Sequence, residues 1–165
     1  YRLRTLRPAE IFFVPNNEEN EQKLADLFKE MAEISELNPG VSVIHGREIP
    51  HKAHSDRAIW FDFRALCFGP RSQADYIYLA EHYEMVFVSG LERLTPQEKA
   101  EARRLTWLID VLYDFRVKLC ATSAVGVNNI YVEGDFAEEF TRTASRMVEM
   151  QSEVYLEQPH LTLKK

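Results

Sequence analysis

The stretch from residue 85 to residue 123 constrains the fold more than any other part of the chain. It begins with the apolar run "MVFVS" and ends with "VKLCATS", and each run is typical of a strand that is covered on both faces. Between them, Thr95-Pro96-Gln97-Glu98 combines an N-cap, a proline at the first helical position and a capping-box glutamate. The helix that follows has four apolar residues on one face: Leu105, Leu108, Ile109 and Leu112. This order predicts a parallel βαβ unit with strands near 85–89 and 117–123.

The flanking segments add helices and short strands, so the predicted class is α/β. "AEIFFV" (9–14) predicts a strand, and residues 18–35 carry the apolar stripe of an amphipathic helix. Ser72 and Asp75 form a capping-box pattern before a helix that reaches about residue 83. Two β-prone runs, "VSVIHGREI" and "RAIWFDF", predict a β-hairpin or a small sheet, with antiparallel pairing near 41–63.

A long C-terminal helix is expected from about Asp135 to Leu156. Its predicted buried stripe consists of Phe136, Phe140, Ala144, Met147, Gln151 and Val154.

The length of 165 residues predicts one domain with a substantial core. Because the first residue is Tyr1 and not methionine, we expect a piece of a longer protein. No apolar run approaches the roughly 20 residues that span a bilayer, and the first ten residues lack a secretory apolar region. Cys67 and Cys120 stand alone in apolar contexts, which favours free thiols in a reducing cytosol or mitochondrial matrix.

The net charge of −6 gives no global reason to expect a nucleic-acid partner, because binding to phosphates needs clustered Lys and Arg. His45, His51, His54 and Asp56 are the one candidate metal cluster, but their spacing matches no metal-binding motif, so a solvated hairpin loop is the better interpretation. No metal site is therefore predicted. Cys120 is interpreted as an inert core thiol, and no Gly-x-Ser-x-Gly elbow occurs.

Gly90 follows a predicted strand and precedes a helix, which is where a phosphate-binding loop would lie. The sequence there, "SGLERLTPQEK", lacks the G-x-x-x-x-G-K-[ST] pattern whose amides and lysine bind phosphates. We therefore do not expect this chain alone to bind or hydrolyse ATP.

Two pairs of arginines have both a structural and a functional interpretation. Arg103 and Arg104 begin the helix of the βαβ unit, and Arg103 projects onto a polar stripe that favours surface ion pairs. Arg142 and Arg146 project away from the buried stripe of the last helix. Glu138 and Glu149 stand at the spacing of helical ion pairs, each of which contributes a few tenths of a kcal/mol. Alternatively, these cations could contact a phosphate.

Three segments, "GPRSQADY", "ARRLTWLIDVLYDFRVKL" and "FTRTASRMVEMQSEVYL", together resemble the ZapE family of AAA+-type ATPases. The opening "YRLR" is similar to the link between the two halves of that family, so the resemblance runs to about Leu156. It implies that residues 1–165 are a single P-loop-NTPase-like C-terminal region of a longer ATPase. The Walker A and B motifs would lie in an N-terminal half. ATP and Mg²⁺ are then expected cofactors of the full-length protein, with none bound by this chain alone.

The resemblance also assigns candidate site residues. Arg142 and Arg146 are candidate arginine fingers, in cis or across a subunit interface, and Arg71, Arg103 and Arg104 are candidate phosphate contacts. "CATSAVGVNNIY" departs from the alanine- and proline-rich family pattern. The matching positions are Pro70, Asp75, Tyr76, Arg103, Arg104, Asp110, Tyr113, Asp114, Arg142, Arg146, Glu149, Met150 and Gln151.

For the whole protein, the resemblance implies ATP-dependent action on FtsZ assembly or on another protein client, with peripheral association with the bacterial division site. A homo-oligomer is one possible state of the protein. Mitochondrial relatives are linked to inner-membrane and matrix proteins, so the expected location is the bacterial cytoplasm or, alternatively, the mitochondrion. The alternative function is a non-catalytic protein-binding module. Its aromatic anchors would be Tyr76, Tyr78, Tyr83 and Trp107.

Overall fold

A mostly parallel sheet with the strand order β1-β7-β6-β5-β4 organises the computed structural model, which describes residues 4–161. Strands β1, β7, β6 and β5 are parallel, and β4 joins the edge antiparallel to β5. Their bounds are β1 Phe12–Phe13, β4 Ala53–His54, β5 Ala58–Asp62, β6 Met85–Leu91 and β7 Lys118–Ser123. The predicted α/β class is confirmed.

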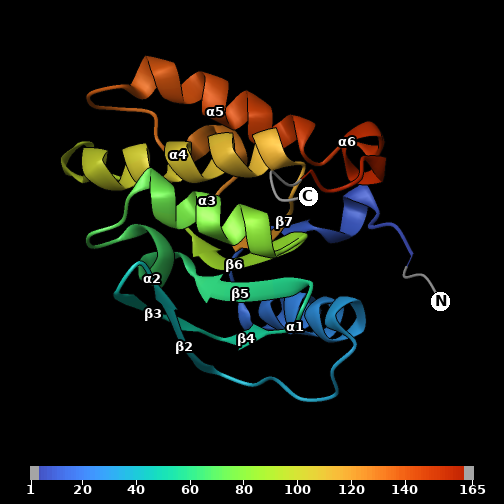
Figure 1. The fold of residues 1–165 in the computed structure, drawn as a ribbon. Coiled ribbons are helices and arrows are strands. Elements are labelled where there is room, and N and C mark those ends of the chain that lie inside the picture. Colours follow the sequence, from blue (N-terminus) through green and yellow to red (C-terminus); the bar gives the residue numbers. More distant parts are fainter. Residues whose placement is uncertain (1–3, 162–165) are drawn as a thin grey trace.

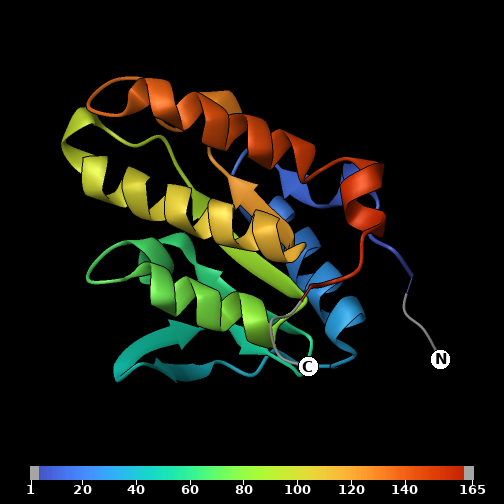
Figure 2. The ribbon, with the colours of Figure 1, turned by 45° about the horizontal axis from the view of Figure 1, so that its top comes forward.

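Helices cover both faces of this sheet. Helix α1 lies on one face, α3 and α4 lie on the other, and α5 lies outside α4 (Figures 1 and 2). The helices are α1 Glu18–Ala32, α2 Phe63–Cys67, α3 Gln73–His82, α4 Lys99–Phe115, α5 Ala137–Glu149 and α6 Glu153–Glu157. Short 3-10 turns span Pro8–Glu10, Pro96–Glu98 and Val127–Asn129.

The predicted βαβ unit is present as β6, α4 and β7. The Thr95 amide donates the capping-box hydrogen bond of 2.8 Å to Oε1 of Glu98, although this contact opens a 3-10 turn and α4 begins at Lys99. All residues of β7, and all of β6 except Gly90, are buried. At the start of α3 the Ser72 amide donates the equivalent hydrogen bond of 2.9 Å to Oδ2 of Asp75.

The predicted antiparallel hairpin lies within the first β-prone run. Its strands are β2 (Gly40–Ile44) and β3 (Arg47–His51), joined by His45 and Gly46, which both have positive φ. The second run does not pair with this hairpin. It forms β5, which pairs with β6 in parallel. Four of the five residues of β5 are buried, as expected for a strand inside the sheet.

The predicted long C-terminal helix is wrong in its length. It divides into α5 and α6, because the Ser152 side chain accepts a hydrogen bond from the Tyr155 amide and starts a new helix. Phe136 and Val154, both predicted to be buried, are 46% and 71% exposed. Phe136 precedes α5 with a φ of 68°, and Val154 follows the break, which interrupts the helical stripe.

Cys67 and Cys120 are free thiols in the core, as predicted. Burial raises the pKa of Cys67 to about 12 and also raises the pKa of Cys120, so both thiols stay protonated near neutral pH. Within residues 4–161, no helix is both long enough and apolar enough to cross a bilayer.

Candidate functional site

Helices α4 and α5 lie side by side and bring most of the candidate residues to one surface. The hydroxyls of Thr106 and Thr143 share a hydrogen bond of 3.0 Å, and Tyr113 donates one of 2.8 Å to Glu149. Residue numbers rise together along both helices in these contacts, so the two helices run in the same direction.

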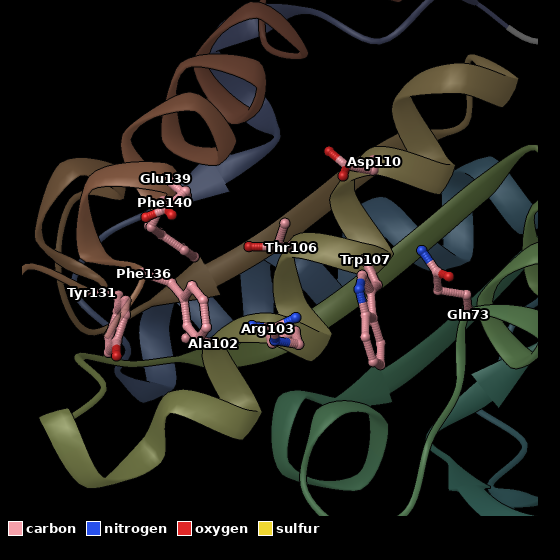
Figure 3. A pocket seen from close by; sticks show the side chains of 10 residues that line it. All are labelled: Gln73, Ala102, Arg103, Thr106, Trp107, Asp110, Tyr131, Phe136, Glu139 and Phe140. Atoms are coloured by element: carbon pink, nitrogen blue, oxygen red, sulfur yellow. The ribbon is translucent and has the colours of Figure 1, made fainter. Parts of the chain in front are cut away.

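A cavity of about 300 Å³ opens beside these helices (Figure 3). Its wall combines four aromatic rings with a few polar groups, which is the usual composition of a ligand or side-chain pocket. The lining residues are Gln73, Ala102, Arg103, Thr106, Trp107, Asp110, Tyr131, Phe136, Glu139 and Phe140.

Arg103 extends from α4 toward Phe136 in this cavity (Figure 3). Its Cζ lies 4.1 Å from the centroid of the Phe136 ring, a cation–π contact. The surface ion pair expected for Arg103 does not form among residues 4–161, and Asp110 pairs with Arg146 instead. Arg103 is thus held by an aromatic ring and keeps its charge uncompensated.

Arg146 is fixed by residues of the neighbouring helix. Its Nη1 donates a hydrogen bond of 2.6 Å to Asp110, and its Cζ lies 4.9 Å from the centroid of the Tyr113 ring. The expected partner Glu149 accepts from the Tyr113 hydroxyl instead, and this hydrogen bond raises the pKa of Tyr113. The guanidinium is therefore held in one orientation from two sides.

Arg142 lies one turn before Arg146 and is exposed. Among residues 4–161 its side chain forms no ion pair, so the expected pair with Glu138 is absent. Arg142 is accordingly the candidate arginine of α5 whose guanidinium has no bond to the rest of the described chain.

Arg71 and Arg104 lie elsewhere, at the C-terminal end of α2. Arg71 donates hydrogen bonds of 2.7 Å to the carbonyls of Ala65 and Pro70. Arg104 donates one of 3.2 Å to the carbonyl of Cys67. Cations near terminal helix carbonyls stabilise the helix end, so both have a structural explanation. The structure thus places Arg103 in the lining of this cavity and bonds Arg146 to the lining residue Asp110. Arg71, Arg104 and Arg142 do not line the cavity.

The cavity also contains residues that the sequence did not point to. Phe136 follows a braced loop, residues 131–135, which two contacts hold in place. The Tyr131 hydroxyl donates a hydrogen bond of 2.6 Å to the carbonyl of Asp135, and the Asp135 carboxylate forms an ion pair of 3.1 Å with Lys99. A left-handed φ at a residue other than glycine is unfavourable and needs such support. The Gly134-Asp135 turn before the helix was the available sequence signal.

Gly90 occupies the position of a phosphate loop but does not present its amide. The Gly90 N–H donates a hydrogen bond of 2.9 Å to the Thr122 hydroxyl. The Gly90 amide is therefore not available to a phosphate oxygen. Among residues 4–161, no group of three or more His, Cys, Asp or Glu side chains is arranged to hold a metal ion.

Comparisons with known proteins give one consistent family. The family model described as AFG1-like ATPase matches residues 1–159. The chain is 33% identical over 161 residues to cell division protein ZapE of Escherichia coli strain K12, a match that covers 98% of this chain and 43% of ZapE. It is 24% identical over 190 residues to lactation elevated protein 1 homolog B of Danio rerio, with 94% and 38% covered. The chain therefore spans less than half the length of these relatives. No solved structure gives a significant match.

Proposed function

Because the chain belongs to the AFG1-like ATPase family, we propose that the complete protein hydrolyses ATP and that residues 1–165 form its C-terminal α/β region. The family assignment confirms the resemblance inferred from the sequence motifs. ATP and Mg²⁺ would be bound by a P-loop half outside this chain, because its sequence contains no Walker A run.

In this proposal, α5 supplies an arginine to the nucleotide phosphates, in cis or across a subunit interface of a homo-oligomer. The observation that carries it is the pair of arginines one turn apart on α5, of which Arg146 is fixed by Asp110 and Arg142 is exposed without an ion pair among residues 4–161. A rigid guanidinium offers paired donors to phosphate oxygens and offsets charge in the transition state. Arg103, beside the same helix surface, is the secondary candidate.

The test is ATP turnover by the full-length protein carrying Arg142→Ala or Arg146→Ala. An arginine finger contributes about 10³- to 10⁵-fold to kcat, so the responsible variant should lose most of its activity at unchanged folding. Arg64→Ala is the matched control, since Arg64 is an exposed arginine that pairs with Glu92 on a different surface. Wild-type turnover in both α5 variants would rule out the arginine role.

We further propose that ATP hydrolysis by the complete protein acts on FtsZ assembly in the bacterial cytoplasm, with peripheral recruitment to the division site. The support is the 33% identity to a protein named for cell division. Lactation elevated protein 1 homolog B is a eukaryotic relative, so we keep the mitochondrial location as the alternative proposal. Sedimentation of FtsZ polymers with full-length protein, with and without ATP, tests the proposal: it fails if ATP has no effect on the sedimented fraction.

A second candidate function, a non-catalytic protein-binding module, is favoured by the β2 edge. Val41 and Val43 on β2 are 55% and 63% exposed, and within residues 4–161 β2 pairs with β3 alone, so another chain could add a strand there. Tyr76 is fully buried and bonded to the Leu66 carbonyl, so it does not serve as a surface anchor. Val41→Lys with Val43→Lys should abolish partner recruitment while ATP turnover persists, and unchanged recruitment would exclude this edge.

A further inference from the structure

A second and larger cavity, of about 740 Å³, lies at the end of the sheet where β5, β6 and β7 begin. It is closed on one side by α6 and by the segment that follows it. Fifteen residues line it: Arg4, Thr5, Leu6, Met31, Glu33, Arg57, Glu84, Met85, Arg116, Lys118, Leu156, Glu157, Gln158, Pro159 and His160. None of these residues lines the α4–α5 cavity, so the two sites are independent.

Lys118 is a nearly buried cation in the wall of this cavity, with an exposed fraction of 9%. Its Nζ donates hydrogen bonds of 2.8 Å to the carbonyl of Arg116 and 2.6 Å to that of Gln158, and the Tyr155 ring centroid lies 4.7 Å away. An ammonium has three donors, and carbonyls carry no full charge to balance it. Within the described part of the chain, no carboxylate forms an ion pair with Lys118.

Arg116 is a second cation beside Lys118 that forms no ion pair within residues 4–161. The one side-chain hydrogen bond of Arg116 within residues 4–161 is a 2.8 Å contact from Nη1 to the carbonyl of Tyr113. The other arginines of the cavity already have partners, since Arg57 pairs with Glu84 and Arg4 pairs with Glu10. Burial and the charge of Arg116 lower the pKa of Lys118 to about 8, as expected where a cation lacks a counter-ion.

Four apolar side chains also line the cavity. Leu6, Met31, Met85 and Leu156 belong to the hydrophobic core and are 5%, 2%, 2% and 5% exposed. We propose that this cavity binds a carboxylate that carries an apolar chain, with its head on Arg116 and Lys118 and its body against these side chains. Arginine binds a carboxylate through two parallel hydrogen bonds, and the volume falls within the roughly 300–1,000 Å³ of small-molecule sites.

The lining carries charges of both signs. Arg116 and Lys118 are cations of the lining without an ion pair among residues 4–161, whereas Arg57 pairs with Glu84 and Arg4 with Glu10. Because the carboxylates of Glu33, Glu84 and Glu157 lie in the same lining, a polyphosphate would meet repulsion, whereas a single carboxylate brings one negative charge to the two cations. Two sources share this chemistry: the C-terminal end of a polypeptide and a free aliphatic acid.

Methyl NMR of ¹³C-methionine in the full-length protein tests the proposal. Of the four methionines of this chain, Met31 and Met85 line the cavity, whereas Met147 and Met150 belong to the core beside α5. Peaks are assigned with single Met→Leu variants. The probes are octanoate, the peptide acetyl-Ala-Ala-Leu-Leu with a free carboxylate, the same peptide as its amide, and inorganic phosphate.

We expect octanoate, the free-carboxylate peptide or both to shift Met31 and Met85 in a saturable way and to leave Met147 and Met150 unchanged. Binding of only one of the two identifies the source of the carboxylate. The proposal is overturned if neither binds, if the peptide amide binds equally well, or if inorganic phosphate produces the same shifts.

The variant Arg116→Gln isolates the role of charge. We expect it to weaken binding by at least about tenfold, because it removes one charged partner of the carboxylate. Lys99→Met, on a different surface, is the control and should bind as the wild type does. Lys118→Met is a second test, with thermal unfolding to monitor the fold, because Nζ also holds the Gln158 carbonyl. Wild-type affinity in Arg116→Gln would refute the site.

Discussion

Nη1 of Arg146 lies 2.6 Å from Oδ1 of Asp110 and joins α5 to α4 across 36 residues of sequence. Both side chains are about 30% exposed, so water screens the pair only in part. The Tyr113 ring also contacts the guanidinium, so the ring and Asp110 together determine where the remaining N–H donors of Arg146 point.

Replacing Asp110 with Asn tests whether this orientation matters. Loss of the charge should lower the free energy of unfolding by about 1 kcal/mol, as for a partly exposed ion pair. If Arg146 acts on the nucleotide, ATP turnover of the full-length protein should fall far more than this small destabilisation explains. Asp114→Asn, an exposed carboxylate one turn later, is the control. Equal turnover in both variants would show that Asp110 does not position a functional arginine.

The sequence predicted those features that depend on local chemistry. The capping boxes at Ser72 and Thr95 formed, because their hydrogen bonds join residues three apart. The apolar runs that became β6 and β7 were recognisable, since burial on both faces requires continuous apolar residues.

The partners of the arginines could not be predicted in the same way. Helical spacing offers Glu138 and Glu139 to Arg142 and Glu149 to Arg146, whereas Asp110 reaches Arg146 through the packing of α4 on α5. The position of β5 was missed for a related reason, because its pairing with β6 depends on a crossover of the chain that no local pattern reports. Phe136 fits the spacing of the buried stripe in the sequence, but α5 begins one residue after it, at Ala137.

Asp75 provides a test of buried charge. It is fully buried, and its Oδ2 accepts hydrogen bonds from Arg47 of the hairpin at 2.7 Å and from the Ser72 amide at 2.9 Å. Arg47→Met should destabilise the fold by about 3 kcal/mol in urea unfolding, because it leaves a buried carboxylate unpaired. The double variant with Asp75→Asn should recover part of that loss. Arg64→Met, which removes the exposed ion pair with Glu92, is the control. If Arg47→Met destabilises the fold no more than Arg64→Met does, the buried carboxylate of Asp75 does not need Arg47.

The burial of His51 should lower the free energy of unfolding in mild acid. Burial, and then the nearby His54, lower the pKa of His51, so the folded chain resists its protonation. The unfolded chain binds the proton near pH 6.5, so stability is complete above that pH and decreases as the pH falls through the window below it. Urea unfolding at pH 7.5, 6.5 and 5.5 should show a smaller decrease for His51→Gln. The exposed-site variant His82→Gln should follow the wild type, and a parallel decrease in all three proteins would refute the assignment.

Gly134 controls the placement of Phe136 in the α4–α5 cavity. Its φ is 119°, and an added Cβ would lie 2.7 Å from the Tyr131 hydroxyl and 2.9 Å from the backbone of Pro96. Gly134→Ala should therefore lower the free energy of unfolding by about 2 kcal/mol or more, through backbone strain and overpacking. It should also change the fluorescence of Trp107, which lines the same cavity. The Trp60→Phe background isolates this signal, because Trp60 and Trp107 are the two tryptophans of the chain.

Gly126→Ala is the matched control. The φ of Gly126 is −63° and the nearest atom lies 4.0 Å from the added Cβ, so this variant should unfold and fluoresce as the wild type does. If Gly134→Ala behaves like Gly126→Ala, the braced loop does not hold Phe136 over Arg103.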